Sequence, residues 1–310
     1  MSFVGKIIAP FFARVVYVAL KIAGWKRGTV LANAKHVAGA VSLDAVPSGA
    51  LNYDTLLKNL TRHAGELLFR FGTFKKLPRD LTAYPCRVDG WDFDIAEGSA
   101  PVLEKMRKGG IFLTAHYGNY EAIGPWLCRL GIPLVASYIP VKPKWLNNIL
   151  ERKIRAVDGG NYSVDARTPR DFIRILNGGK LFCLLADQDS RIPSAIPGTF
   201  LGRPVNVNPL PDFLLKHRPQ TPVFICWMEE REASLNGPKP RKVRVLHAVE
   251  VERSLGLSSA QSKVFSSAET SVVNAQFNEW LEERIRENPN LWYGFTHRRF
   301  YSKSPEIYGN

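Results

Sequence analysis

Short apolar runs alternate with longer amphipathic stretches through most of the chain. The apolar runs have the length of buried β-strands, and they occupy residues 111–114, 134–139, 181–186, 223–227 and 243–246. Helical patterning covers residues 50–75, 145–157, 169–177 and a last stretch that stops before Pro289. Strand–helix alternation at this spacing predicts an α/β fold, with a mixed, mainly parallel sheet flanked by helices.

The amino terminus has a different pattern, because its apolar residues are interrupted only by basic ones. The first 43 residues contain no acidic residue and six basic ones, which are Lys6, Arg14, Lys21, Lys26, Arg27 and Lys35. At about 100° per residue, Lys6, Arg14 and Lys21 fall within a stripe of roughly 80°, and apolar side chains cover the rest of the helix. No run of about 18 uncharged residues is present, and no small-residue cleavage site is obvious, so neither an ordinary membrane span nor a secretory signal is predicted.

A helix with a wide apolar face and a thin cationic edge is typical of segments that lie in the headgroup region of a membrane. We therefore expect residues 1–27 to form a membrane-associating amphipathic helix and residues 28–310 to form one domain. Two alternatives stay open. One is a buried terminal helix whose basic side chains reach water, and the other is a tilted span whose basic side chains reach the membrane interface.

Composition adds size and charge to this picture. With 310 residues, 45% of them apolar, the chain suits one large domain or two small ones. The formal charge of +14 attracts nucleic acid, anionic lipid or an acidic protein without selecting among them. The four cysteines lie far apart, with no paired spacing, which argues against a disulfide framework or a zinc site and fits a reducing compartment.

His116 is the first candidate for chemistry. The strand predicted at residues 111–114 ends just before it, which places His116 at the carboxyl end of a strand, where α/β sheets position their sites. Glu121 follows about one helical turn later, so that its carboxylate can hold one ring nitrogen while the other takes a proton from a hydroxyl. No serine or cysteine lies beside His116, which favours direct attack by an acceptor hydroxyl. On the spacing alone, a hydrogen-bonded core histidine with Glu121 capping a helix is the commoner outcome.

Two acidic residues, Asp187 and Asp189, form the second candidate, after the apolar run at residues 181–186. They can bind a metal, accept a phosphoryl group, or hold loops and basic side chains. The Asp-x-Asp spacing after a strand is also the start of an aspartyl-phosphate phosphatase pattern. That alternative needs a later acidic pair for magnesium, whereas the only later aspartate is Asp212 and the nearest acidic cluster is at residues 229–232.

Taken in order, these motifs and two later segments resemble the bacterial lipid A biosynthesis (late) acyltransferases, within the lysophospholipid acyltransferase superfamily. The segments are His116-Tyr-Gly-Asn-Tyr-Glu121, Leu-Leu-Ala-Asp-Gln-Asp at 184–189, Gly198-Thr-Phe-Leu-Gly-Arg-Pro204 and Trp292-Tyr-Gly-Phe-Thr-His-Arg-Arg-Phe300. The first matches the family's His-x4-Glu signature, with Tyr117 and Tyr120 in place of Phe and Trp. The similarity covers most of the chain.

The resemblance implies a glycerolipid acyltransferase-like fold and an enzyme on the cytoplasmic face of the inner membrane. It implies an acyl thioester, on acyl carrier protein or coenzyme A, as donor and a lipid A precursor or related envelope lipid as acceptor. His116 is then the general base and Glu121 its orienting partner, within a matching Gly118 and Asn119. No metal or cofactor is implied.

Further residues carry over as substrate-binding or structural support. They are Asp187, Gln188 and Asp189, together with four basic candidates for an acceptor's phosphate, Arg152, Arg155, Arg167 and Arg170. The basic surface suits both anionic phospholipid and the acidic carrier protein. Nucleic-acid binding, the rival explanation, requires basic residues interleaved with aromatics on one exposed face. Here the densest basic stretch instead lies beside an apolar helix.

Overall fold

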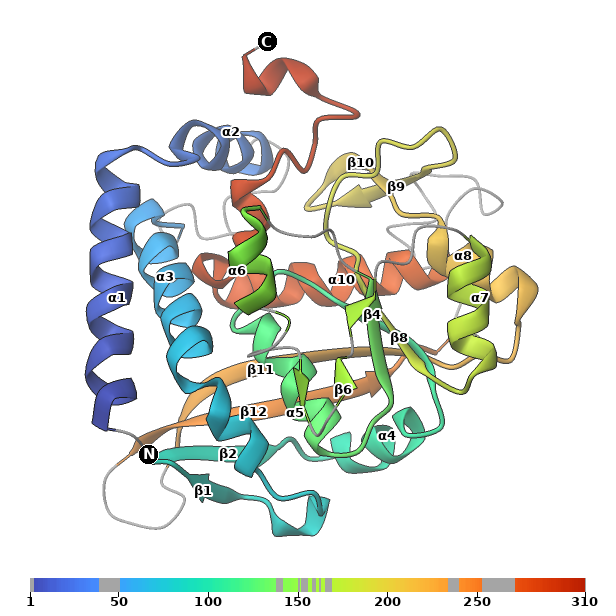
Figure 1. Cartoon of the computed structure of the whole chain (residues 1–310). Helices are drawn as coiled ribbons and strands as arrows, with labels where there is room; N and C mark the ends of the chain where they lie inside the picture. The colour runs from blue at the N-terminus through green and yellow to red at the C-terminus, as the bar shows by residue number, and fades with distance from the viewer. Residues whose placement is uncertain are drawn as a thin grey trace.

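The computed structural model describes residues 3–38, 51–137, 142–149, 151, 156–157, 160–161, 163–164, 169–233, 240–252 and 271–309. In this part of the chain the centre is an eight-stranded sheet in the order β1-β2-β12-β11-β3-β8-β4-β7 (Figure 1). Its strands are β1 (Cys86–Val88), β2 (Trp91–Ile95), β3 (Gly110–Thr114), β4 (Leu134–Ser137), β7 (Ser163–Val164), β8 (Leu181–Leu185), β11 (Val223–Ala233) and β12 (Arg241–Glu250). Two small sheets pair β9 (Ile196–Phe200) with β10 (Arg203–Val207), and β5 (Ala156–Val157) with β6 (Gly160–Asn161).

The large sheet is mixed and mostly parallel, as predicted. Only β1–β2 and β11–β12 pair antiparallel among its described strands. Successive side chains alternate between its faces, so Ile111 and Leu113 of β3 join one buried cluster and Phe112 joins the other. Because both faces are covered, the central strands are continuous apolar runs in the sequence.

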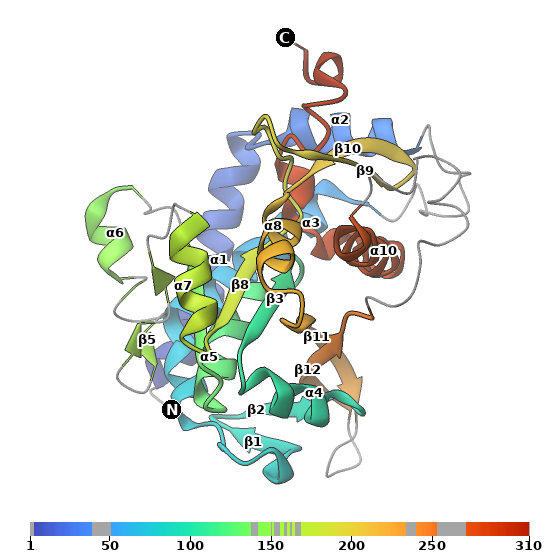
Figure 2. The ribbon, with the colours of Figure 1, turned by 90° about the vertical axis from the view of Figure 1, so that its right-hand side faces the viewer.

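Helices cover the two faces of the sheet. They are α1 (Phe3–Ile22), α2 (Arg27–Ala38), α3 (Tyr53–Arg70), α4 (Ser99–Met106), α5 (Ile123–Arg129), α6 (Lys144–Ile149), α7 (Pro169–Asn177), α8 (Leu210–His217) and α10 (Val272–Glu287). Leu214 of α8 and Phe277 of α10 pack in one core, whereas Leu103 of α4 and Trp126 of α5 pack in the other. The β9–β10 hairpin and α2 lie near the carboxyl terminus at the same end of the molecule (Figure 2).

The sequence patterns predicted these elements unevenly. The five predicted strands correspond to β3, β4, β8, β11 and β12, and the helix predicted at residues 169–177 is α7. Residues 138 and 139 of one predicted strand lie outside the described residues. The helix predicted at residues 145–157 is wrong at its end, because α6 stops at Ile149 and residues 156–157 form β5.

The amino-terminal segment folds as two helices joined by a sharp turn. No single described helix is long and apolar enough to cross a bilayer, although residues 7–22 and 27–38 pass that test together, as a pair bent by 78°. One face of α1 packs on α3, where Ala9 and Ala13 are buried and a Cβ on Gly65 would lie 2.7 Å from the Ala9 carbonyl oxygen. At the other end of this interface, Lys21 forms an ion pair with Asp54 at 2.6 Å.

The opposite face of α1 is apolar and exposed. Its exposed side chains are Ile7, Ile8, Phe11, Val15, Val18 and Ile22, and Leu31 of α2 is exposed as well. Phe11 and Ile22 are 68% and 83% exposed, values uncommon for such large apolar side chains in a water-facing helix. Within the described chain, α1 is thus buried on one face only.

Candidate active site

Parallel pairing of β3 with β8 brings the two sequence motifs to one edge of the sheet. Thr114 lies opposite Leu185 at the ends of the strands, and the Ala186 N–H donates to the Thr114 carbonyl at 3.0 Å. His116 and Asp187 each follow two residues after that last strand pair. Consequently, the His116 backbone N–H donates to Oδ2 of Asp187 at 3.0 Å, and Nδ1 of the ring lies 2.8 Å from Oδ1.

The Asp187 carboxylate is ionised although its side chain is fully buried. Its Oδ2 also accepts a hydrogen bond from the Trp292 indole Nε1–H at 2.9 Å. Burial raises the pKa of Asp187, but the charge and hydrogen bonds of His116 and the Trp292 donor outweigh burial and bring it to about 2. An ionised carboxylate only accepts hydrogen bonds, so Nδ1 of His116 carries a proton, and Nε2 presents its lone pair when the ring is neutral.

Glu121 was predicted to orient His116, whereas the carboxylate that the structure places on Nδ1 is that of Asp187. Glu121 lies in a short 3-10 helix, Tyr120–Ala122, before α5. Burial lowers the pKa of His116, the charge and hydrogen bond of Asp187 raise it more, and the charge of Glu121 raises it further. Glu121 therefore acts on the imidazole through its charge, and Asp187, expected only as pocket or structural support, holds the ring.

Nε2 of His116 lies next to an exposed side chain, that of Gln188. The His116 side chain is 14% exposed, and the Gln188 side-chain nitrogen lies 3.5 Å from Nε2. The Tyr120 ring meets the imidazole edge-on at 4.9 Å, and the ring of His297 lies 5.5 Å away. Gln188 and His297 are exposed, so the side chains next to this imidazole nitrogen reach solvent.

The loop that follows His116 is fixed by the segment before the carboxyl terminus. The His116 carbonyl accepts from the Tyr293 N–H, and the Gly118 N–H donates to the Leu291 carbonyl, both at 2.8 Å. Gly118 has a φ of +59°, a left-handed conformation that glycine adopts without strain. The loop that begins at His116 is therefore held by backbone hydrogen bonds to residues 291 and 293, far from β3 in the sequence.

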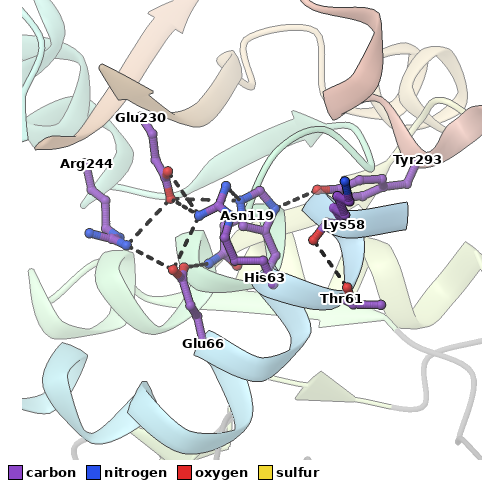
Figure 3. Close-up of polar contacts among 9 residues, drawn as sticks. Lys58, Thr61, His63, Glu66, Asn119, Glu230, Arg244 and Tyr293 are labelled. Atoms are coloured by element: carbon purple, nitrogen blue, oxygen red, sulfur yellow. Dashed lines mark hydrogen bonds and ion pairs between the residues drawn. The ribbon is translucent and has the colours of Figure 1, made fainter. Parts of the chain in front are cut away.

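A buried network of charged side chains lies beneath this loop (Figure 3). His63 of α3 contacts the Tyr293 hydroxyl through Nδ1 at 2.6 Å and Arg62 through Nε2 at 2.8 Å. Burial and the charge of Arg62 lower the pKa of His63 to about 3, so its ring is neutral at ordinary pH. Since a guanidinium only donates, Nε2 accepts from Arg62 and Nδ1–H donates to Tyr293.

Two carboxylates complete the network. Arg62 donates to Oε1 of Glu230 at 2.8 Å, and Arg244 lies 3.3 Å from Glu66 and 3.6 Å from Glu230. Glu66 also accepts, at 3.5 Å, from the side-chain amide of Asn119. Burial of these charges is offset by their pairing, and the network ties the loop that bears Asn119 to α3.

The remaining predicted residues are scattered. Asp189 accepts from the backbone N–H of Ser302 at 3.1 Å and from its hydroxyl at 2.7 Å, and pairs with Arg191 at 3.2 Å, so it anchors the terminal segment. Arg170 is exposed on α7. The other three basic candidates, Arg152, Arg155 and Arg167, lie outside the described residues. Asp187 has both oxygens engaged and no exposed side-chain surface, which does not suit a phosphoryl acceptor.

No protein-family model matches the chain, and no curated protein sequence matches it. Across the described ranges, no group of three or more His, Cys, Asp or Glu side chains is arranged to hold a metal ion. The arrangement that remains is a buried carboxylate paired with a partly exposed imidazole at the carboxyl edge of the sheet.

Proposed function

We propose that the protein is a membrane-associated O-acyltransferase. It moves a fatty acyl chain from an acyl thioester, on acyl carrier protein or coenzyme A, to a hydroxyl of a lipid acceptor. A lipid A precursor or a related envelope lipid is the acceptor that the sequence resemblance favours. The observation that carries the proposal is the His116–Asp187 pair at the carboxyl edge of the sheet, in which Asp187 holds Nδ1 and the imidazole side chain remains 14% exposed.

The chemistry follows from that pair. Nε2 of His116 takes the proton of the acceptor hydroxyl as its oxygen attacks the thioester carbonyl, a step that general-base catalysis accelerates by about 10²–10⁴-fold. Asp187 stabilises the imidazolium that forms. The tetrahedral intermediate expels the thiolate, which takes the proton back from Nε2, and an ester and a free thiol result. Backbone N–H groups after Gly118 are the donors we propose for the oxyanion.

Direct attack by the acceptor is favoured over a covalent enzyme intermediate. Among the described residues, the side chains in hydrogen-bond or ring contact with the His116 imidazole include Asp187, Gln188, Tyr120 and His297. None of them is the serine or cysteine that a covalent route with this histidine as base requires. A thiolate also leaves without strong acid assistance, because thiols have a pKa of about 8.5.

The membrane association is proposed from the exposed face of α1. Phe11, Val15 and Ile22 present apolar area to solvent, and the nearby Arg14, Lys26 and Arg27 are exposed cations. Lipid headgroups and acyl chains satisfy both kinds of side chain in one plane. An acceptor dissolved in that bilayer is then within reach of a protein attached to its surface.

The test uses purified protein, an acyl thioester and vesicles that contain a hydroxyl-bearing envelope lipid. Mass spectrometry follows the lipid that gains the acyl group in place of its hydroxyl hydrogen. Wild type forms this product, and His116→Gln, which keeps a polar side chain but cannot act as a base, lowers the rate at least about 10²-fold. His217→Gln, which changes an exposed histidine of α8, is the matched control and retains activity. Turnover by purified His116→Gln close to wild type overturns the proposal.

A further inference from the structure

The indole of Trp292 lies against the buried side of the His116–Asp187 pair. Its ring is fully buried and packs edge-on against Phe200 at 5.2 Å and Phe295 at 4.6 Å. Only its N–H is directed to a polar group, the Oδ2 atom of Asp187 at 2.9 Å. The Trp292 ring has no exposed surface from which to touch a substrate.

Gly294 makes room for this indole. A Cβ on Gly294 would lie 2.1 Å from Cε2 of the Trp292 ring and 2.4 Å from its Nε1, which is closer than any real contact. Any larger residue at position 294 must displace the ring from Asp187. Between them, Tyr293 donates its backbone N–H to the His116 carbonyl. The segment 292–294 therefore contacts both members of the pair.

We propose that Trp292 is a positioning residue for the His116–Asp187 pair and that Gly294 is required for its placement. The indole N–H takes one carboxylate oxygen, which leaves the other aligned with the imidazole Nδ1. It also withdraws charge from the carboxylate and so keeps the imidazole less basic than Asp187 alone would make it. This inference deepens the proposed acyl transfer and rests on it for the catalytic consequence, but not for the geometry.

Other charged groups face the same site. Glu121 acts on His116 by its charge, and the buried Arg299 acts on Asp187. His297 lies beside His116 and is itself influenced by Lys26 of the turn between α1 and α2. A substitution at position 292 leaves all of these groups in the chain. A change in the titration of His116 between wild type and a Trp292 variant therefore reports the loss of the indole donor.

Removing the indole donor should raise the pKa of His116. Without the indole donor, the carboxylate charge is less delocalised and stabilises the imidazolium more strongly, so His116 gives up its proton at higher pH. We expect the acidic limb of the rate profile to move upward by about half a pH unit or more, which is a loss of about threefold in rate on that limb. The KM for either substrate stays unchanged, because the buried ring contacts neither.

The experiment replaces Trp292 in the full-length protein with Phe and, separately, with benzothienylalanine, which keeps the indole shape but has sulfur in place of N–H. The second variant preserves packing if Phe leaves a cavity. The matched control places benzothienylalanine at Trp227, another buried indole, whose N–H has no hydrogen-bond partner in the described structure. Gly294→Ala is made alone and together with Trp292→Phe.

NMR titration of His116 in ¹⁵N-histidine-labelled protein is the first readout, because it does not depend on acyl transfer. We expect the pKa of His116 to rise in both Trp292 variants and in Gly294→Ala, with a change in the Nδ1–H signal. Both readouts stay unchanged in the Trp227 control. In the Trp292→Phe background, Gly294→Ala adds little to the shift, since the N–H donor to Asp187 is already absent. An unchanged or acid-shifted titration in the Trp292 variants overturns the inference. If the titration shifts but wild type transfers no acyl group, the proposed function fails and the positioning role stands.

Discussion

Asp187, rather than the nearer Glu121 in sequence, is the residue on which the base should depend. In Asp187→Asn, the amide group can present an N–H to Nδ1 of His116 and force the ring into the tautomer that cannot accept a proton at Nε2. We expect its kcat to fall by at least about 10²-fold. Glu121→Gln removes a charge that acts on His116 without being the carboxylate on Nδ1, and should cost distinctly less.

Measured kcat values for the two variants decide this point in a single assay. Glu121→Gln supplies the comparison, because it changes a carboxylate to an amide in the same way. Equal losses, or a larger loss in Glu121→Gln, would contradict the assignment of Asp187 as the orienting carboxylate.

His63 predicts a pH dependence of stability. Its pKa is lowered from 6.5 to about 3 in the folded protein, by burial and by Arg62. The unfolded chain therefore takes up a proton near pH 6.5 that the folded protein refuses until about pH 3. The free energy of unfolding contributed by this group is present above pH 6.5 and falls by up to about 1.4 kcal/mol per pH unit on acidification.

His63→Gln removes this titration and retains one acceptor and one donor for Arg62 and Tyr293. Urea unfolding of both proteins at pH 7.5 and 5 measures the difference. We expect the variant to lose less stability than wild type between the two pH values. The same loss in both proteins would show that His63 is not held neutral.

The sequence could predict His116 but not its partner. The histidine ends an apolar run, and that signal is local. Asp187 reaches it only because β8 pairs parallel to β3 in a register that sets Thr114 opposite Leu185. No spacing within one segment encodes a register between strands more than 60 residues apart. Trp292 and Tyr293 lay within a segment of the resemblance, but the pattern gave no sign that they touch both motifs.

At the scale of elements, the interface between α1 and α3 depends on Gly65. In Gly65→Ala, the new methyl carbon would lie 2.7 Å from the Ala9 carbonyl oxygen, and backbone cannot yield as a flexible side chain does. We expect a loss of about 1–3 kcal/mol in the free energy of unfolding, measured by urea.

Gly28→Ala in α2 is the matched control, because a Cβ there meets nothing within 4 Å. This change should be neutral or stabilising by up to about 1 kcal/mol, since alanine favours helix more than glycine does. A stable Gly65→Ala variant would show that α1 does not pack this closely on α3.

The strands that the sequence predicted are continuous apolar runs, whereas the strands or parts of strands that it missed contain loop-type or charged residues. The central strands β3 and β8 are buried on both faces, so their apolar runs are continuous. In contrast, β9 contains Pro197 and Gly198, residues that usually mark loops. The outer half of β11 carries Glu229 to Glu232, and it is held in the sheet by pairing with β12 rather than by its own hydrophobicity.

At the scale of the whole molecule, the net charge of +14 and the exposed face of α1 should act together at a membrane. We expect the protein to float with vesicles that contain anionic lipid and to bind less as salt rises. Phe11→Ser removes a ring that is 68% exposed and should weaken vesicle binding by about tenfold or more.

Val249→Ser is the control for that experiment, because it removes an exposed apolar side chain from β12, away from α1. Its binding to vesicles should match that of wild type. Equal loss in both variants would indicate a general effect of surface hydrophobicity, and no loss in Phe11→Ser would contradict docking through α1.

The most direct measurement of the central claim is made on the lipids of the cell. A strain that lacks this protein is supplied with wild type or with His116→Gln, and its envelope lipids are compared by mass spectrometry. We predict one lipid class that is heavier with wild type, by an acyl group in place of a hydrogen, and that reverts to the unacylated mass with His116→Gln. Identical lipids in both strains would contradict it.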